Sequence, residues 1–179
     1  MPMVHTDPPR LMRPSVDDPA AAEAANAFQE ARGVAPFGPF VPLLHHPALL
    51  ARVEALGRGV RYQGDLPDDV REVAVLATAA AWQQSTEWSI HAPVAVAAGV
   101  AQSTLDALQR GGMPDDAPWP QVCAIRFVQQ VHALRDVEDP VFDAAMKAFG
   151  PAGLIELSVL AGYYALLAVV LNVTRLHEH

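Results

Sequence analysis

A glutamate and a histidine lie four residues apart in an apolar, alanine-rich part of the sequence. Glu87 and His91 belong to the stretch TEWSIHAPVAVAAGV, residues 86–100, where leucine would suit a core helix better. Residues i and i+4 share one face of a helix, so the two side chains can touch or converge on one ligand. A carboxylate beside an imidazole raises the pKa of the histidine, and such a pair can exchange a proton with a bound substrate. The pattern therefore indicates general acid/base chemistry.

A second carboxylate, Glu72, lies in the middle of the preceding apolar segment, where an unpaired charge would be costly. The helical patterns over 67–83 and 86–99 are separated by a very short link, so we expect an antiparallel hairpin that turns Glu72 toward the Glu87/His91 pair. In this hypothesis His91 donates and accepts the proton, and Glu87 orients and charges it. Glu72 is then a further partner or a second base.

Other interpretations of these residues stay open. A Glu/His pair at this spacing is also common on a solvated surface, and Glu72 can continue the charged run that begins at Asp68. The pair can also supply two metal ligands, but a stable site needs a third and a fourth, and the surroundings do not resemble HExxH. We therefore expect no metal and no cofactor.

The composition narrows the class of protein. A chain of 179 residues suits one compact domain, and its apolar half is rich in alanine, valine and leucine, which favours packed helices. A net charge of −8 without a Lys/Arg cluster argues against nucleic acid as a partner. Cys123 is the only cysteine, so an intramolecular disulfide is impossible and we expect a cytoplasmic protein. The stretch 154–173 is long enough to span a bilayer, but Glu156 and other polar residues in it favour a buried helix, so no membrane is expected.

Helix signals recur along the chain. Asp18 before Pro19 and Gly33 predict a first helix over 19–32, preceded by a flexible arm over 1–16. A proline-rich loop with large apolar groups follows over 34–46. Further helices are expected over the ranges 47–62, 67–84, 86–99, 122–137, 139–150 and 151–171, together with a short one capped by Ser103. Ser85 or Thr86 can cap the helix over 86–99, and Pro93 should bend this helix or limit it to two short pieces. No segment alternates like a strand, so the fold class is all-α, with one domain over 17–179.

The run LPDDVREVAVLATAAAWQQSTEWSIHAPVAVAAGV, residues 66–100, resembles the core of the carboxymuconolactone decarboxylase family. The matching positions are Arg71, Glu72, Glu87, Trp88, His91, Ala95, Gly99 and Val100. Flanking segments extend the resemblance over about 35–173. This family shares its helical bundle with the alkylhydroperoxidase D proteins, so the resemblance implies that fold and a homo-oligomer, a trimer or hexamer.

The sequence also departs from the branches of this superfamily. The peroxidase branch carries a Cys-x-x-Cys pair, and here the two positions hold Gln84 and Glu87. A disulfide redox cycle needs two thiols or a thiol and a partner, so a thiol peroxidase is not expected. The decarboxylases end in a Tyr-x-Gly-x-Pro type segment, whereas this chain has AGYYALLAVV. The resemblance therefore predicts the fold and the acid/base pair, but not the substrate.

We expect cofactor-independent acid/base chemistry, a decarboxylation or a related lyase or isomerase step, on a small carboxylated or enolisable molecule. Its catalytic residues would be His91, Glu87 and Glu72. The candidates for substrate binding are Trp88, Arg71, Gln84 and Tyr163, although the aromatic residues can equally be core and Arg71 can form a surface ion pair. The alternative is a non-catalytic protein that uses the same fold for ligand binding or assembly. An enclosed pocket holding Glu87 and His91 would favour catalysis.

Overall fold

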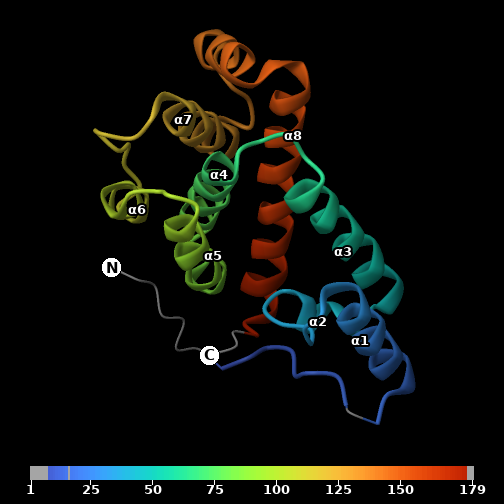
Figure 1. Cartoon of the computed structure of the whole chain (residues 1–179). Helices are drawn as coiled ribbons and strands as arrows, with labels where there is room; N and C mark the ends of the chain where they lie inside the picture. The colour runs from blue at the N-terminus through green and yellow to red at the C-terminus, as the bar shows by residue number, and fades with distance from the viewer. Residues whose placement is uncertain (1–7, 16, 177–179) are drawn as a thin grey trace.

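The chain is built from α-helices. The computed structural model describes residues 8–15 and 17–176, and no strand occurs among these residues, which confirms the predicted all-α class (Figure 1). The helices are α1 (Pro19–Arg32), α2 (Phe40–Leu43), α3 (Pro47–Tyr62), α4 (Asp68–Ala81), α5 (Ser85–Ala97), α6 (Gln102–Gln109), α7 (Trp119–Leu134) and α8 (Asp139–Thr174).

The predicted start and stop signals act where they were expected. The Asp18 carboxylate accepts hydrogen bonds from the backbone N–H groups of Ala20 and Ala21 and so caps α1. Gly33 ends that helix with φ at 75°, a left-handed conformation that glycine adopts without strain. Pro47 occupies the first position of α3, where its missing N–H is not needed.

Some local predictions were wrong. The expected loop over 34–46 contains the short helix α2. Neither Ser85 nor Thr86 caps α5, because the side-chain oxygen of Gln84 accepts the backbone N–H of Thr86 at 2.8 Å. Ser103 does not cap α6 either, since that helix already begins at Gln102 after an extended Ala101 that has no capping side chain.

Proline and glycine act differently in the two apolar helices that contain them. α5 is one continuous helix with Pro93 inside it, so it is not divided into two pieces. α8 is interrupted at Gly150, whose φ of 66° and ψ of −177° are not helical, and Pro151 follows at once. The two predicted helices over 139–150 and 151–171 are therefore the two arms of α8 on either side of this kink.

Helix α4 lies at the centre of the core. All residues from Val70 to Ala79 are buried, and α4 packs against α5, α7 and α8. α8 passes through the middle of the molecule, with α4 to α7 on one side and α1 to α3 on the other (Figure 1). Four helices, α3, α4, α5 and α8, therefore surround one interior region.

Helix α8 is long and apolar enough to cross a membrane by length and composition alone. Half of its most apolar window is buried against the rest of the fold, which is the behaviour of a core helix in a globular protein. Its Glu156 carboxylate accepts the backbone N–H groups of Asp65 and Leu66 at 2.7 and 3.2 Å and ties α8 to the start of α4.

The start of the described chain lies along the end of α8. The backbone N–H groups of Arg10 and Leu11 donate to the carbonyl of Thr174 at 2.8 and 3.2 Å. His45 Nε2 lies 2.8 Å from the carbonyl of Met12. Residues 1–7 and 16 of the predicted flexible arm lie outside the described residues, so the arm and the domain boundary stay predictions.

Candidate active site

Glu72 and His91 face each other across the α4–α5 hairpin. The turn over 82–84 reverses the chain, and His91 Nδ1 then lies 2.8 Å from Glu72 Oε2. An ionised carboxylate can only accept a hydrogen bond, so Nδ1 carries the proton and donates it to Glu72. This assignment leaves a lone pair on His91 Nε2, the nitrogen that faces away from Glu72.

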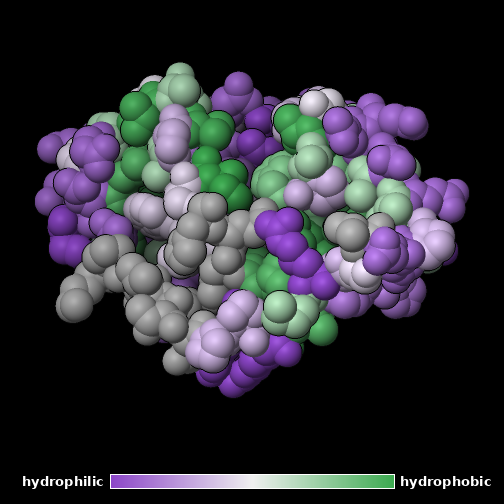
Figure 2. Space-filling model, turned by 90° about the horizontal axis from the view of Figure 1, so that it is seen from below, coloured by the Kyte–Doolittle hydropathy of each residue, from purple (hydrophilic) through white to green (hydrophobic). Residues whose placement is uncertain are grey.

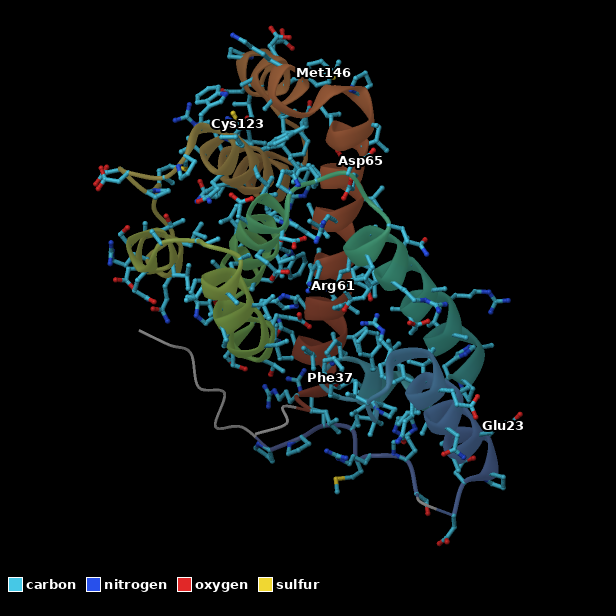
Figure 3. The ribbon with its side chains drawn as sticks, viewed as in Figure 1. Glu23, Phe37, Arg61, Asp65, Cys123 and Met146 are labelled. Carbon is cyan, nitrogen blue, oxygen red and sulfur yellow. The ribbon has the colours of Figure 1, made fainter. Side chains whose placement is uncertain are left out.

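Arg61, at the end of α3, holds the second oxygen of Glu72. Its Nη2 donates to Glu72 Oε1 at 3.0 Å, and its Nη1 donates to the hydroxyl of Tyr164 on α8 at 2.7 Å. Nη1 also lies 3.2 Å from His91 Nδ1, which is a close approach and not a second hydrogen bond while Nδ1 donates to Glu72. Arg61 thus joins the helices at the centre of the molecule (Figure 3).

Glu87 stands on the other side of the imidazole. Its Oε2 lies 3.6 Å from His91 Nε2, which is beyond hydrogen-bond length, and its Oε1 is buried without a hydrogen-bond partner among the described residues. Burial raises the pKa of Glu87 to about 7, although the positive charge of Arg61 opposes the shift. Glu87 can therefore hold or release a proton near neutral pH.

The charge states of Glu72 and His91 follow from the same surroundings. Burial lowers the pKa of His91, and the Arg61 charge adds to this, while the bond to Glu72 only partly opposes it. Burial would raise the pKa of Glu72, but the hydrogen bonds and charges of His91 and Arg61 outweigh it and hold that pKa below its ordinary value. At neutral pH Glu72 is ionised and His91 is neutral.

Two parts of the sequence hypothesis need correction. A raised pKa for His91 was expected, but the imidazole is only 5 % exposed, and loss of hydration disfavours its charged form. Glu87 was expected to orient His91, but Glu72 does so, since it makes the 2.8 Å contact while Glu87 is 3.6 Å away. Glu72 therefore has the orienting role that was expected of Glu87.

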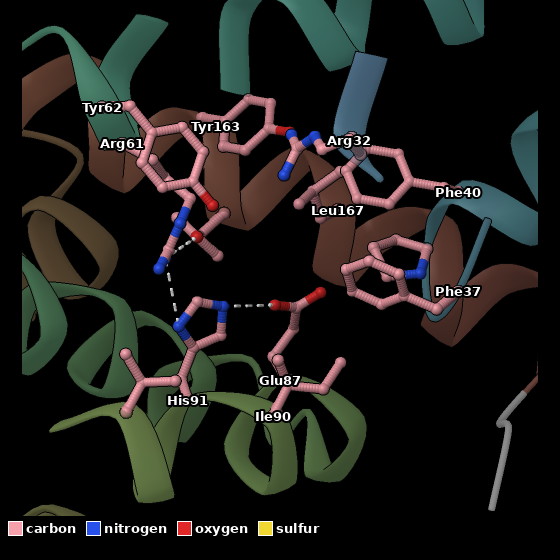
Figure 4. A pocket seen from close by; sticks show the side chains of 13 residues that line it. Arg32, Phe37, Phe40, Arg61, Tyr62, Glu87, Ile90, His91, Tyr163 and Leu167 are labelled. Atoms are coloured by element: carbon pink, nitrogen blue, oxygen red, sulfur yellow. Dashed lines mark hydrogen bonds and ion pairs between the residues drawn. The ribbon is translucent and has the colours of Figure 1, made fainter. Parts of the chain in front are cut away.

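A cavity of about 210 Å³ opens beside Glu87 and His91 (Figure 4). Apolar and aromatic side chains form most of its wall, and two arginines, Arg32 and Arg61, border it. The lining residues are Arg32, Phe37, Pro39, Phe40, Arg61, Tyr62, Glu87, Ile90, His91, Val94, Tyr163, Tyr164 and Leu167. This is the kind of apolar pocket with a few convergent polar groups that binds small molecules.

Of the four predicted substrate-binding residues, only Tyr163 lines this cavity. Trp88 borders a separate, more open depression next to α6. Arg71 is held by Asp68 at 2.6 Å and by the carbonyl of Leu66. Gln84 caps α5 and donates to the side-chain oxygen of Asn172 at 2.8 Å. These three side chains have structural partners elsewhere, so we do not retain them as ligands of a substrate in this cavity.

Sequence reasoning missed the role of both arginines. Arg61 lies in the last turn of α3, where a basic residue is expected merely from the helix dipole. Its partners are 11, 30 and 103 residues away, so no local spacing pointed to them. Phe37 and Phe40 could be suspected from the large apolar groups in the expected loop over 34–46.

The described residues contain no group of three or more His, Cys, Asp or Glu side chains arranged to hold a metal ion. Cys123 is buried on α7, well away from Arg61 (Figure 3). Its neighbours belong to a small depression between α7 and α8 that does not include Glu87 or His91.

The helices adopt a fold of the alkylhydroperoxidase D type. A crystal structure described as an alkylhydroperoxidase AhpD core, an uncharacterized peroxidase-related protein from Ralstonia eutropha JMP134, is similar to this chain with a TM-score of 0.76 and 20 % identity. The similarity covers 96 % of this chain and 92 % of that one, and it shows the fold. No curated protein matches the chain.

The model of the carboxymuconolactone decarboxylase family matches residues 47–121, from α3 to the start of α7. Over this stretch the chain is similar to the family whose resemblance the sequence motifs indicated. Arg61, Glu72, Glu87 and His91 all lie inside the matched stretch. Arg32, the aromatic residues of the segment 37–40 and the tyrosines of α8 lie outside it.

Proposed function

We propose that this protein catalyses proton transfer at a carbon atom of a small enolisable acid, in a decarboxylation or a related lyase or isomerase step that uses acid/base groups alone. The proposal is supported chiefly by the spatial order of three side chains. The neutral imidazole of His91 lies between the ionised carboxylate of Glu72 and the carboxyl group of Glu87, whose pKa is about 7, and Glu87 and His91 line an apolar cavity. Groups that titrate near the working pH are the most effective general acids and bases.

For a decarboxylation the geometry supplies each transfer. The bond between the substrate carbon and its carboxylate breaks, carbon dioxide leaves, and the electron pair moves into a conjugated carbonyl. The protonated Glu87 then delivers its proton to that carbon, and the resulting carboxylate recovers a proton from water. In an isomerisation, His91 Nε2 removes a proton from one carbon and Glu87 returns one to another. Glu72 keeps the His91 tautomer fixed in both cases.

Two probes test this function. Carbon dioxide release from γ-carboxymuconolactone tests the reaction after which the family is named, and deuterium incorporation at C3 of phenylpyruvate in D2O tests proton transfer at carbon in general. We expect at least one of these reactions to be catalysed. Glu87→Gln should slow either reaction, and His91→Ala should slow the deuterium exchange, each on the order of a hundredfold or more. Unchanged folding, checked by circular dichroism, would assign the loss to chemistry.

The opposite result is equally informative. If both probes bind but react no faster with the wild type than with Glu87→Gln, the protein binds a ligand without turning it over and the catalytic proposal is wrong. The enclosure of Glu87 and His91, which are 3 % and 5 % exposed, supports catalysis over simple binding.

We further propose that the chain is not a thiol peroxidase. Gln84 caps a helix and Glu87 faces the cavity at the two positions where the redox branch has cysteines. Hydroperoxide turnover with a dithiol donor should therefore be absent. Turnover that disappears in Cys123→Ser would show the contrary.

A homo-oligomer, a trimer or hexamer, also remains a proposal. α8 exposes apolar side chains at intervals of three, four and seven residues, namely Ile155, Val159, Leu166, Val169 and Val173. Hydrophobic areas are also visible on the face of the molecule that is seen from below, with hydrophilic residues around them (Figure 2). Exposed apolar area of this kind favours association with further copies. Analytical ultracentrifugation at micromolar concentration should show an assembly, and a monomer alone would contradict it.

A further inference from the structure

A second arginine–carboxylate cluster lies on α3, the helix that also supplies Arg61 to the cluster with Glu72 and His91. Glu54, Arg58 and Arg61 are spaced at i, i+4 and i+7, so they occupy one face of α3. Arg32 of α1 donates through Nε to Glu54 Oε1 at 3.0 Å, and Arg58 Nε lies 3.5 Å from the same oxygen. Two guanidinium groups share one carboxylate, which leaves this cluster with a net positive charge.

Only one of these two guanidinium groups borders the cavity. Arg32 is part of the lining, whereas the Arg58 side chain is 46 % exposed on the outer side and borders a different depression, between α1 and α3. Arg32 uses Nε for Glu54, and its two terminal nitrogens make no hydrogen bond to any described residue. The guanidinium lies over the rings of Phe40 and Tyr62, 5.2 and 6.0 Å from their centres, which fixes its plane. Figure 4 shows it reaching toward the space in front of Glu87.

An unpartnered hydroxyl lies on the same side of the cavity. Tyr163 is 3 % exposed, and its hydroxyl oxygen is buried without a hydrogen-bond partner in the described part of the chain. The hydroxyl packs against Gly57 of α3, where a side chain would have no room. A buried polar group without a partner is costly, so this hydroxyl is a place where a ligand atom would be stabilised.

The distribution of charge around the cavity favours an anionic ligand. Arg61 is matched by Glu72, and His91 is neutral, so the catalytic end carries no excess charge while Glu87 is protonated. The excess positive charge lies at the Arg32 end. A planar guanidinium with free terminal nitrogens matches the geometry of a carboxylate, which it can bind through two parallel hydrogen bonds.

We propose that Arg32 anchors the single carboxylate of a compact monoanionic ligand, with the Tyr163 hydroxyl as a second donor. The volume sets the size, since a 150 Å³ apolar cavity holds benzene and about 210 Å³ therefore admits one ring with a short substituent. The aromatic residues Phe37 and Phe40 offer faces for such a ring. The inference deepens the proposed function because it names the ligand class of that cavity, but it needs binding alone and no turnover.

Benzoate and its neutral analogue benzamide test the anchor, with calorimetric titration as the measurement. We expect benzoate to bind at least tenfold more tightly than benzamide, and Arg32→Met to remove this preference. Arg58→Gln is the matched control, because it also loses a guanidinium from Glu54 but does not border the cavity, and it should keep the preference. Tyr163→Phe should weaken benzoate binding several-fold.

Because Arg32→Met leaves Glu54 with a weaker partner, the double variant Arg32→Met/Glu54→Gln guards against misfolding and should show the same loss. Equal losses in Arg32→Met and Arg58→Gln, or equal binding of benzoate and benzamide by the wild type, would overturn the proposal. Benzoate has no enolisable carbon, so these results do not depend on catalysis. If deuterium exchange is absent, a preference for benzoate over benzamide can still be found. If that preference is absent, proton transfer at carbon can still be found.

Discussion

α3 contributes to two arginine–carboxylate clusters that bury similar groups but differ in how the charges are balanced. Glu72 is 2 % exposed and Glu54 is 5 % exposed. Glu72 receives one guanidinium, an imidazole N–H and no competing cation in contact, and its guanidinium is also bonded to Tyr164. Glu54 receives two guanidinium groups, one of which reaches solvent.

This difference separates a cluster that satisfies itself from one that is incomplete. In the first cluster nearly every polar atom has a partner. The bond to Glu72 therefore keeps the proton of His91 on Nδ1. In the second, a positive charge and free N–H groups remain, and only a ligand can use them. One cavity thus joins a region whose polar groups have partners, inside the matched stretch 47–121, to a region with unpaired N–H groups that comes mainly from outside it.

The largest expected difference between the two clusters is in the free energy of unfolding after the carboxylate is replaced. Glu72→Gln leaves the Arg61 guanidinium deep in the fold without a countercharge, and breaking a buried ion pair in this way costs about 3–5 kcal/mol. Glu54→Gln should cost clearly less, because Arg58 can turn into solvent. Urea unfolding of both variants measures the difference. Equal losses of unfolding free energy in the two variants would contradict the difference between the clusters.

A second prediction uses the titration of Glu87. Its pKa in the folded protein, about 7, lies above its ordinary value of 4.5, so its contribution to stability is complete below pH 4.5 and is lost as the pH rises to about 7. Glu87→Gln removes this titration. Relative to the wild type, the variant should gain about 3 kcal/mol between pH 4 and pH 8, measured by urea unfolding at both values. A constant difference between the two proteins would contradict the raised pKa.

The smallest effect compares two adjacent tyrosines. Tyr164→Phe removes the acceptor of a charged hydrogen bond from Arg61 and should cost about 1.5–3 kcal/mol. Tyr163→Phe removes a hydroxyl that has no partner among the described residues and should leave the stability nearly unchanged or raise it. Thermal unfolding of both variants is sufficient, and a larger loss in Tyr163→Phe would reveal a bond that the structure does not contain.

Much of the fold could be predicted because its signals are local. Asp18, Gly33 and Pro47 mark helix ends through backbone chemistry that acts within a few residues. The cap of α5 was misjudged because glutamine is a rare capping residue, and Gln84 was considered for a substrate instead. The kink at Gly150 was marked in the sequence by the glycine and the proline after it.

The site could be predicted only as far as helix spacing reaches. Glu87 and His91 are one turn apart, and a short link brings Glu72 opposite them, so these three could be expected together. The choice between Glu72 and Glu87 as the partner of His91 depends on side-chain distances that no pattern contains. Arg32 and Tyr163 meet at the cavity although 131 positions separate them in the numbering, and only the packing of α1 and α8 around α3 brings them together.

The close approach of Tyr163 to Gly57 has a consequence for divergence within this fold. A methyl group at position 57 would push the tyrosine ring away from α3 and toward the cavity, because the hydroxyl occupies the space that a side chain would need. The size of the molecule that the cavity admits can therefore be changed by position 57, which is not part of the lining, while Glu72, Glu87 and His91 stay the same. Position 57 is the place to look when relatives with the same glutamates and histidine accept molecules of different size.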